Sequence, residues 1–187
     1  MLVLASASPR RKAILENAGF EFTVCPAKGE ISPGQNARPD EFVVENALLK
    51  AREVADIYDE NQIILGADTI VYHDGEILGK PKDKAQAFEM LKRLSNRTHQ
   101  VYTGYAVIHG DKTVTGCEIT SVTFRALDDR EIEDYIATGE PFDKAGAYGI
   151  QGRGCVFVSR IEGDFFNVAG LPICRINLAI KSMGGNN

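Results

Sequence analysis

Apolar residues recur along the chain with two spacings, one typical of amphipathic helices and one typical of strands. Over residues 40–58 the apolar positions repeat at helical intervals, which predicts a long amphipathic helix with Lys50 near the margin of its buried face. Other helix starts are marked by residues that cap a first turn or fix its backbone. Such starts lie at Ser8-Pro9, Asp83, Asp128 and Pro172, and a helix is predicted after each.

Runs rich in β-branched and aromatic residues predict the strands. They cover residues 1–5, 20–25, 63–72, 99–109, 113–124 and 155–161, with a short β-prone segment at 165–168. Asp74-Gly75 and Gly110-Asp111 lie between such runs and predict hairpins, so antiparallel pairs enter the sheet. Residues 26–39 are rich in Pro, Gly and Ser and predict a long loop. The mixture predicts one α/β domain over residues 1–187, with a mixed β-sheet and flanking helices.

Composition and charge exclude several classes of protein. The 21 Lys and Arg residues against 26 Asp and Glu residues give a net charge of -5, which argues against a general nucleic-acid binder or a protein of anionic membranes. No apolar run approaches the roughly 20 residues of a membrane-spanning helix. The 4 cysteines are scattered, which favours a reducing compartment over a disulfide framework or a zinc site. The positive charges near the N-terminus follow the first apolar run, unlike those of a signal peptide, so we expect a cytoplasmic protein.

The segment LASASPRRKAIL carries positive charge where a helix disfavours it. With Ser8 as the N-cap, the side chains of Arg10, Arg11 and Lys12 fall in the first helical turn. An anion at the helix mouth would relieve this conflict, held by backbone N–H groups, the Ser6 and Ser8 hydroxyls and the guanidinium groups. Phosphate is the natural candidate, and the alternative is a solvated basic turn on a surface helix.

Three further segments carry candidate chemistry. Asp68 stands in the apolar run ILGADTIV, where a carboxylate must be paired, bound to a metal or open to a cleft, so it is the best candidate for a base. Glu30 in the long loop could join it as a metal ligand. Lys80, restricted by Pro81, could present an ammonium group from a rigid turn. The alternatives are that Asp68 caps a turn and that Lys80 is a solvated surface lysine.

The segment DKAGAYGIQGRG places Gly146, Gly149 and Gly152 three residues apart, with Gly154 beyond them. Repeated glycines let a backbone approach a ligand closely, although a mobile surface loop would have the same composition. Within this loop the amide of Gln151 could complement the edge of a uracil or thymine ring. No role is assigned to His73, His99 and His109, which show no ligand spacing and are expected on hairpin or strand surfaces.

Several motifs together resemble the Maf family of nucleoside triphosphate pyrophosphatases, in the same order and at comparable spacing. They are LASASPRRKAIL, GADTIV, LGKPKD, LSNRTHQVYTG, TGEPFDKAGAYGIQGRG and GDFFNVAGLP. The glycine-rich loop resembles the corresponding loop of the family branch that hydrolyses dTTP and UTP. The resemblance implies an α/β fold related to the inosine triphosphate pyrophosphatases, bilobed with a central cleft, together with a divalent metal, Mg²⁺ or Mn²⁺, and a homodimer.

The resemblance also implies roles for individual residues. The family's proton acceptor falls on Asp68, and its positions important for substrate specificity fall on Arg10, Thr69 and Gln151. Positions associated with the polyphosphate fall on Ser6, Arg11, Lys50 and Lys80, and the metal ligands fall on Glu30 and Asp68. Gly29 departs from the pattern, because many family members carry a second acid there.

We therefore expect an enzyme that hydrolyses dTTP and UTP to the monophosphate and pyrophosphate, in the role of nucleotide-pool sanitation. Its expected partner is the nucleoside triphosphate, with no nucleic acid and no membrane. Two alternatives stay open: a pyrophosphatase for methylated GTP or another noncanonical nucleotide, and a nucleotide-binding regulator of septum formation.

Overall fold

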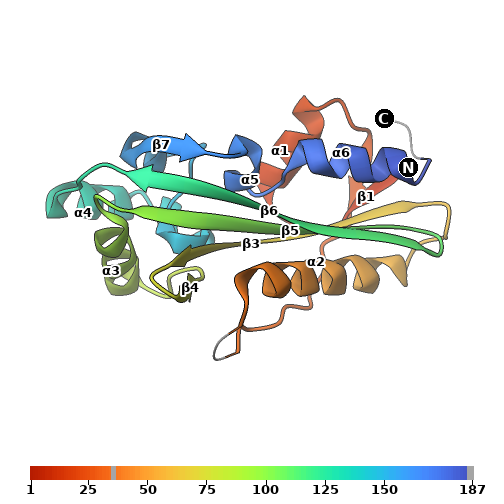
Figure 1. Ribbon diagram of the computed structural model, residues 1–187, viewed down its shortest axis with the longest axis horizontal. Helices are drawn as coiled ribbons and strands as arrows, with labels where there is room; N and C mark the ends of the chain where they lie inside the picture. The colour runs from red at the N-terminus through yellow and green to blue at the C-terminus, as the bar shows by residue number, and fades with distance from the viewer. Residues whose placement is uncertain (35–36, 185–187) are drawn as a thin grey trace. The chain divides into compact units, whose positions relative to one another are not determined.

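The computed structural model describes residues 1–34 and 37–184, and their strands form a seven-stranded mixed sheet (Figure 1). The strands are β1 (Leu2–Leu4), β2 (Phe22–Val24), β3 (Ile63–His73), β4 (Glu76–Leu78), β5 (Thr98–His109), β6 (Lys112–Phe124) and β7 (Val158–Glu162). The α-helices are α1 (Pro9–Asn17), α2 (Pro39–Ala55), α3 (Lys84–Leu94), α4 (Asp129–Ala137), α5 (Phe165–Val168) and α6 (Ile173–Ser182). Short 3-10 helices are η1 (Glu140–Asp143), η2 (Ala145–Ala147) and η3 (Arg153–Phe157).

The sheet contains both parallel and antiparallel pairs. Its strand order is β2-β1-β3-β5-β6-β7, with β4 paired to β3. β1 runs parallel to β2 and β3, whereas β4 and β7 are antiparallel to their partners β3 and β6. The predicted α/β class with a mixed sheet and flanking helices is therefore confirmed.

The chain divides into two compact units, each assembled from separate stretches of sequence. The first contains Met1–Thr69, Thr103–Glu118 and the chain from Gly170 onward. The second contains Ile70–Tyr102 and Ile119–Ala169. Strands β3, β5 and β6 each begin in one unit and continue into the other.

In the first unit, helix α2 packs unusually close to the strands because two strand positions lack a side chain. A Cβ atom built on Gly66 of β3 would lie 2.1 Å from the carbonyl oxygen of Ala47. A Cβ atom on Gly104 of β5 would lie 2.3 Å from the backbone of Val43. Figure 1 shows α2 and α6 on opposite faces of these strands. The backbone of α2 therefore rests almost directly on the sheet.

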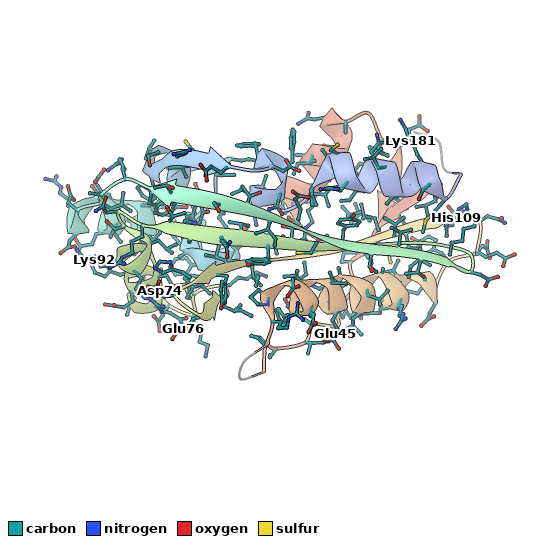
Figure 2. All side chains as sticks on the ribbon, viewed as in Figure 1. Glu45, Asp74, Glu76, Lys92, His109 and Lys181 are labelled. Atoms are coloured by element: carbon teal, nitrogen blue, oxygen red, sulfur yellow. The ribbon has the colours of Figure 1, made fainter. Side chains whose placement is uncertain are left out.

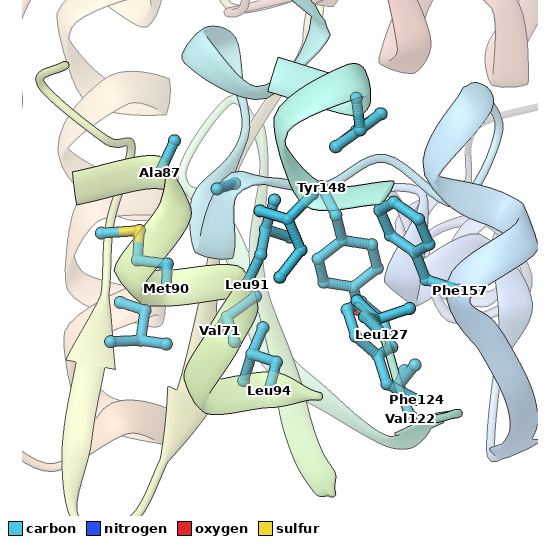
Figure 3. Packing of buried hydrophobic residues seen from close by; sticks show 14 of the residues in the cluster. Val71, Ala87, Met90, Leu91, Leu94, Val122, Phe124, Leu127, Tyr148 and Phe157 are labelled. Carbon is cyan, nitrogen blue, oxygen red and sulfur yellow. The ribbon is translucent and has the colours of Figure 1, made fainter. Parts of the chain in front are cut away.

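The core of the second unit combines aliphatic side chains with a cluster of aromatic rings. Tyr148 and Phe157 pack edge-on or tilted against Phe124, beside aliphatic side chains from α3 such as Leu91 (Figure 3). His99 belongs to this core, because it is 2 % exposed and its ring contacts Phe124 and Tyr148.

The expectation that the three histidines lie on the surface is wrong for two of them. His99 is buried, and so is His73, which is 4 % exposed. Both stand on strands, where alternate side chains face the core, so their position in the pleat decides their burial. His109, near the end of β5, is half-buried.

Local signals in the sequence predict most element ends correctly. Asp83 and Asp128 cap α3 and α4 with their side chains, and Asp128 forms a full capping box with Glu131. The β-prone interpretation of residues 165–168 is wrong, because Asp164 accepts a hydrogen bond from Phe166 and starts the short helix α5. The strand predicted at 155–161 begins only at Val158, after η3. The long loop predicted at 26–39 includes residues 35–36, which lie outside the described residues.

Exposed charged side chains lie on helices of the first unit. Figure 2 shows Glu45 on α2 and Lys181 on α6, both of which are exposed. Among residues 1–34 and 37–184, no helix combines the length and the apolar character needed to cross a membrane.

Candidate functional site

A buried carboxylate and a lysine meet where α2 crosses β3. Alternate residues of a strand face opposite sides, so Asp68 shares with Gly66 the face that α2 covers. Asp68 is 6 % exposed, and its Oδ1 atom lies 2.6 Å from the Lys50 Nζ atom. A bare carboxylate at this depth would be costly, and the ammonium group compensates it. The close approach allowed by Gly66 therefore places Lys50 on Asp68.

Glu30 also lies near Lys50. Its Oε1 atom is 3.7 Å from the Lys50 Nζ atom, and its side chain is largely exposed. Lys50 thus contacts both carboxylates that the sequence predicts as metal ligands.

Helix α2 also fixes the loop that carries Glu30. The amide group of Asn46 accepts a hydrogen bond from the Ile31 N–H at 2.7 Å and donates to the Ile31 carbonyl at 3.2 Å. The Glu53 carboxylate accepts from the N–H groups of Lys28 and Gly29. These backbone hydrogen bonds lower the pKa of Glu53 below its ordinary value. The loop is therefore held on both sides of Glu30.

Three polar residues of α2 form the stripe that makes these contacts. Asn46, Lys50 and Glu53 follow the helical spacing that places residues on one face. Asn46 is fully buried, so its two hydrogen bonds to the loop replace those it would make with water. The Glu53 carboxylate of α2 accepts from the Gly29 N–H at 2.7 Å, directly before Glu30 in the chain.

On the opposite face of β3, Arg11 ties three segments together. Its Nε atom donates to the Gly170 carbonyl at 2.9 Å, Nη1 donates to Ser6 Oγ at 3.0 Å and Nη2 donates to Thr69 Oγ1 at 3.1 Å. Burial lowers the pKa of Arg11, opposed by the nearby charges of Asp68 and Glu30. Arg11 thus links the turn between β1 and α1, strand β3 and the start of the segment that runs from Gly170 onward.

The Ser6 and Thr69 hydroxyls are both engaged by this network. Ser6 Oγ accepts from the Ser8 N–H at 3.2 Å as well as from Arg11, so its own hydrogen is available to a further acceptor. Thr69 Oγ1 lies 3.0 Å from Thr103 Oγ1 and 3.5 Å from the Gly170 carbonyl oxygen. Ser8 is the N-cap of α1 as predicted, although its side chain makes no capping hydrogen bond.

The positive first turn of α1 is present in the structure. Arg10 and Arg11 follow Pro9, the first helical residue, and no acidic residue lies in this turn. Arg10 is half-buried, whereas Arg11 is buried. The first unit therefore brings together Ser6, Arg11, Glu30, Lys50, Asp68 and Thr69, with Arg10 beside Arg11 in the chain.

The remaining two predicted site residues, Lys80 and Gln151, belong to the second unit, and both are exposed. Lys80 follows β4, and Gln151 lies in the glycine-rich loop. The Gly146 N–H donates to the Gly79 carbonyl at 3.1 Å, so the segments that carry these two residues are joined by a backbone hydrogen bond.

The glycines of this loop permit close contacts within the protein. A Cβ atom on Gly149 would lie 2.5 Å from the Lys144 side chain, and one on Gly152 would lie 2.2 Å from the Glu140 carboxylate. A Cβ atom on Gly146 would lie 2.7 Å from Val71, and this glycine has a left-handed φ of 66°. The loop folds tightly around its own neighbours.

The carboxylates of the first unit suit one kind of metal site. Among the residues that the structure describes, no group of three or more His, Cys, Asp or Glu side chains could hold an ion. Glu30 and Asp68, both on Lys50, supply two carboxylates. Mg²⁺ commonly binds through one or two carboxylates plus substrate phosphates and water. The donor set therefore fits an ion that arrives with a phosphorylated ligand.

Sequence reasoning missed the residues that support the site. Asn46 and Glu53 could have been noticed, because polar residues spaced with Lys50 interrupt the face of a long amphipathic helix. Gly66, in the middle of a buried strand, was a sign of close backbone approach. Nothing in the local sequence links Glu140 to the glycine-rich loop.

Comparisons with known proteins identify a family and several relatives. The family described as Maf-like protein matches residues 1–183. The dTTP/UTP pyrophosphatase of Bacillus cytotoxicus is 52% identical over 179 residues, which cover 96% of this chain and 93% of that protein. The dTTP/UTP pyrophosphatase of Bacillus mycoides is 50% identical over 180 residues, covering 96% and 94%. Among solved structures, the Staphylococcus aureus Ham1 protein is similar at 17% identity and a TM-score of 0.45, over 66% of this chain and 71% of that one.

Proposed function

The chain belongs to the Maf family, and we propose that it is a nucleoside triphosphate pyrophosphatase that hydrolyses dTTP and UTP to the monophosphate and pyrophosphate. The observation that carries this proposal is the buried Asp68 carboxylate, held by Lys50 and lying close enough to Arg11 to interact with its charge. Such a carboxylate among cations suits a reaction in which water attacks a phosphate. The relatives that share this activity by name match almost the whole chain.

We assign to Asp68 the role of orienting and deprotonating the attacking water. Lys50 holds Oδ1, which fixes the orientation of the carboxylate, and the other oxygen takes a proton from the water as it attacks the α-phosphorus. The new bond joins the water oxygen to the α-phosphorus. The bond from the α-phosphorus to the bridging oxygen breaks, and the pyrophosphate leaves with that oxygen.

Cations of the first unit would neutralise the triphosphate. Phosphoryl transfer depends mainly on positioning and on electrostatic stabilisation of the transition state. Arg10, Arg11 and Lys50 supply positive charge, and Ser6 offers the hydroxyl hydrogen that its two N–H donors leave available. We assign Lys80 to the polyphosphate as well, as the resemblance implies.

A divalent cation, Mg²⁺ or Mn²⁺, completes the proposal. Glu30 and Asp68 would hold it together with the phosphates of the substrate. When bound, the ion acts as a Lewis acid that stabilises negative charge on the phosphate oxygens.

Base selection is assigned to Arg10, Thr69 and Gln151. Gln151 offers a donor and an acceptor that suit the edge of uracil or thymine. Thr69 Oγ1 is engaged by Arg11, so its influence would pass through the position of that guanidinium group. A role in nucleotide-pool sanitation follows from this activity. The homodimer and the cytoplasmic location stay predictions.

The experiment that tests this function measures pyrophosphate and orthophosphate release from a panel of nucleoside triphosphates with Mg²⁺ or Mn²⁺. We expect pyrophosphate release from dTTP and UTP, lowered on the order of 10²-fold or more by Asp68→Asn. The matched control is Asp56→Asn, an exposed aspartate at the end of α2, which should retain full turnover. Thermal unfolding of each variant shows whether it is folded. Near-normal turnover by Asp68→Asn would refute the assignment of the base.

A further inference from the structure

Two side chains anchor the turn that presents Gln151, one on each side of it. On one side, the Gly149 N–H donates to the Tyr135 hydroxyl at 3.2 Å. On the other, the Arg153 N–H donates to Glu140 Oε2 at 2.9 Å, and the Gly154 N–H lies 3.4 Å from Oε1. The turn itself is closed by the Gly152 N–H, which donates to the Gly149 carbonyl. Gln151 therefore stands at the tip of a clamped turn.

The two anchors are bonded to each other. Tyr135 projects from α4, is 5 % exposed and donates from its hydroxyl to Glu140 Oε1 at 2.9 Å. Burial and the Glu140 carboxylate raise the pKa of Tyr135, so it stays a donor. Burial opposes the ionisation of Glu140, but the hydrogen bonds from Arg153, Tyr135 and Gly154 outweigh it, and the pKa of Glu140 lies below its ordinary value. Glu140 is thus a charged acceptor at the centre of the network.

The glycines of the turn are needed for this arrangement. A Cβ atom on Gly152 would lie 2.2 Å from Glu140 Oε1, and one on Gly154 would lie 2.9 Å from the Tyr135 hydroxyl oxygen. Neither glycine has a left-handed φ, so the need for glycine comes from the lack of space for a Cβ atom. The turn has no room for side chains on the face that meets Glu140 and Tyr135.

We propose that Glu140, together with Tyr135, is a positioning residue for base selectivity, because it fixes the turn that presents Gln151. The inference rests on the proposed function of Gln151 as a reader of the pyrimidine edge. Glu140 would not touch the substrate. Its effect would arise because a misplaced hydrogen-bonding group loses much of its discrimination between bases.

The test uses the isosteric change Glu140→Gln in the full chain. An amide NH2 group cannot accept, so one of the N–H or O–H donors on Glu140 loses its partner. We expect the ratio of kcat/KM for UTP to that for GTP to fall about tenfold or more. Tyr135→Phe, which removes the hydroxyl shared by Gly149 and Glu140, should lower the same ratio and serves where Glu140→Gln does not fold. The matched control is Glu133→Gln, an exposed glutamate of α4, which should leave the ratio unchanged.

A double-mutant cycle separates positioning from stability. If Glu140 acts through Gln151, then Glu140→Gln adds no further loss of selectivity once Gln151→Ala is in place. A lower melting temperature with an unchanged ratio in Glu140→Gln and Tyr135→Phe would overturn the inference, and so would additive losses in the double mutant. An unchanged ratio in Gln151→Ala would instead overturn the proposed role of Gln151, so the two failures are distinguishable.

Discussion

Acidification should destabilise the protein through one buried side chain, His99. Its Nε2 atom lies 2.8 Å from the Tyr148 hydroxyl, and its ring is packed against Phe124. Among the described residues, its Nδ1 atom has no hydrogen-bond partner. A protonated imidazole would therefore carry an unpaired N–H group in an apolar core. Burial, and to a lesser degree the neighbouring His73, lowers the pKa of His99 to about 3.

The size of the effect follows from the difference between the two pKa values. An exposed histidine of the unfolded chain binds a proton below pH 6.5, whereas His99 in the folded protein binds one only near pH 3. Between these limits the unfolded state holds one more proton, so the free energy of unfolding falls as the pH falls, by about 1.4 kcal/mol per pH unit. Above pH 6.5 none of this stability is lost. From about pH 7 to pH 5 the loss due to His99 is about 2 kcal/mol.

Urea unfolding of the wild type and of His99→Phe at several pH values measures this loss. Phenylalanine keeps the ring in the core but cannot titrate. We expect the difference in unfolding free energy between the two proteins to change by about 2 kcal/mol from pH 7 to pH 5, in favour of the variant. The control is His109→Phe, at a half-buried histidine of the same strand. Parallel pH profiles for the wild type and His99→Phe would refute the reasoning.

Two further predictions concern the first unit. Gly66→Ala should destabilise the fold by roughly 1–3 kcal/mol and lower kcat, because the new Cβ atom pushes α2 and Lys50 away from β3. The control in urea unfolding and turnover assays is Gly34→Ala, whose Cβ atom would meet nothing within 4 Å, and equal stability of the two variants would contradict the packing argument. In calorimetry, Mn²⁺ should bind the protein measurably only when a non-hydrolysable dTTP analogue is present, and Glu30→Gln should weaken that binding. Tight stoichiometric binding of Mn²⁺ to the nucleotide-free protein would contradict a site of two carboxylates.

Local chemistry explains which parts of the fold could be predicted from the sequence. The caps at Asp83 and Asp128 and the turn at Asp74-Gly75 act within a few residues, so their signals are readable in a short stretch of chain. Residues 165–168 were misread because two aromatic side chains favour a strand, whereas the cap at Asp164 starts a helix.

In the candidate site, too, some features could be predicted from the local sequence and others could not. The buried position of Asp68 could be predicted, because a carboxylate in an apolar strand needs a partner, and the structure supplies Lys50. The loop contacts of Asn46 and the anchoring of the glycine-rich loop by Glu140 depend on residues that are distant in sequence. Such contacts arise from packing, and no local pattern encodes them.

In the proposed reaction, water attacks the α-phosphorus of dTTP under the control of Asp68. The most direct test is hydrolysis of dTTP in water labelled with heavy oxygen, with the products separated and weighed by mass spectrometry, for the wild type beside Asp68→Asn. We expect the label in dTMP, unlabelled pyrophosphate, and little of either product from the variant. Label in the pyrophosphate, release of orthophosphate, or equal product from Asp68→Asn would contradict it.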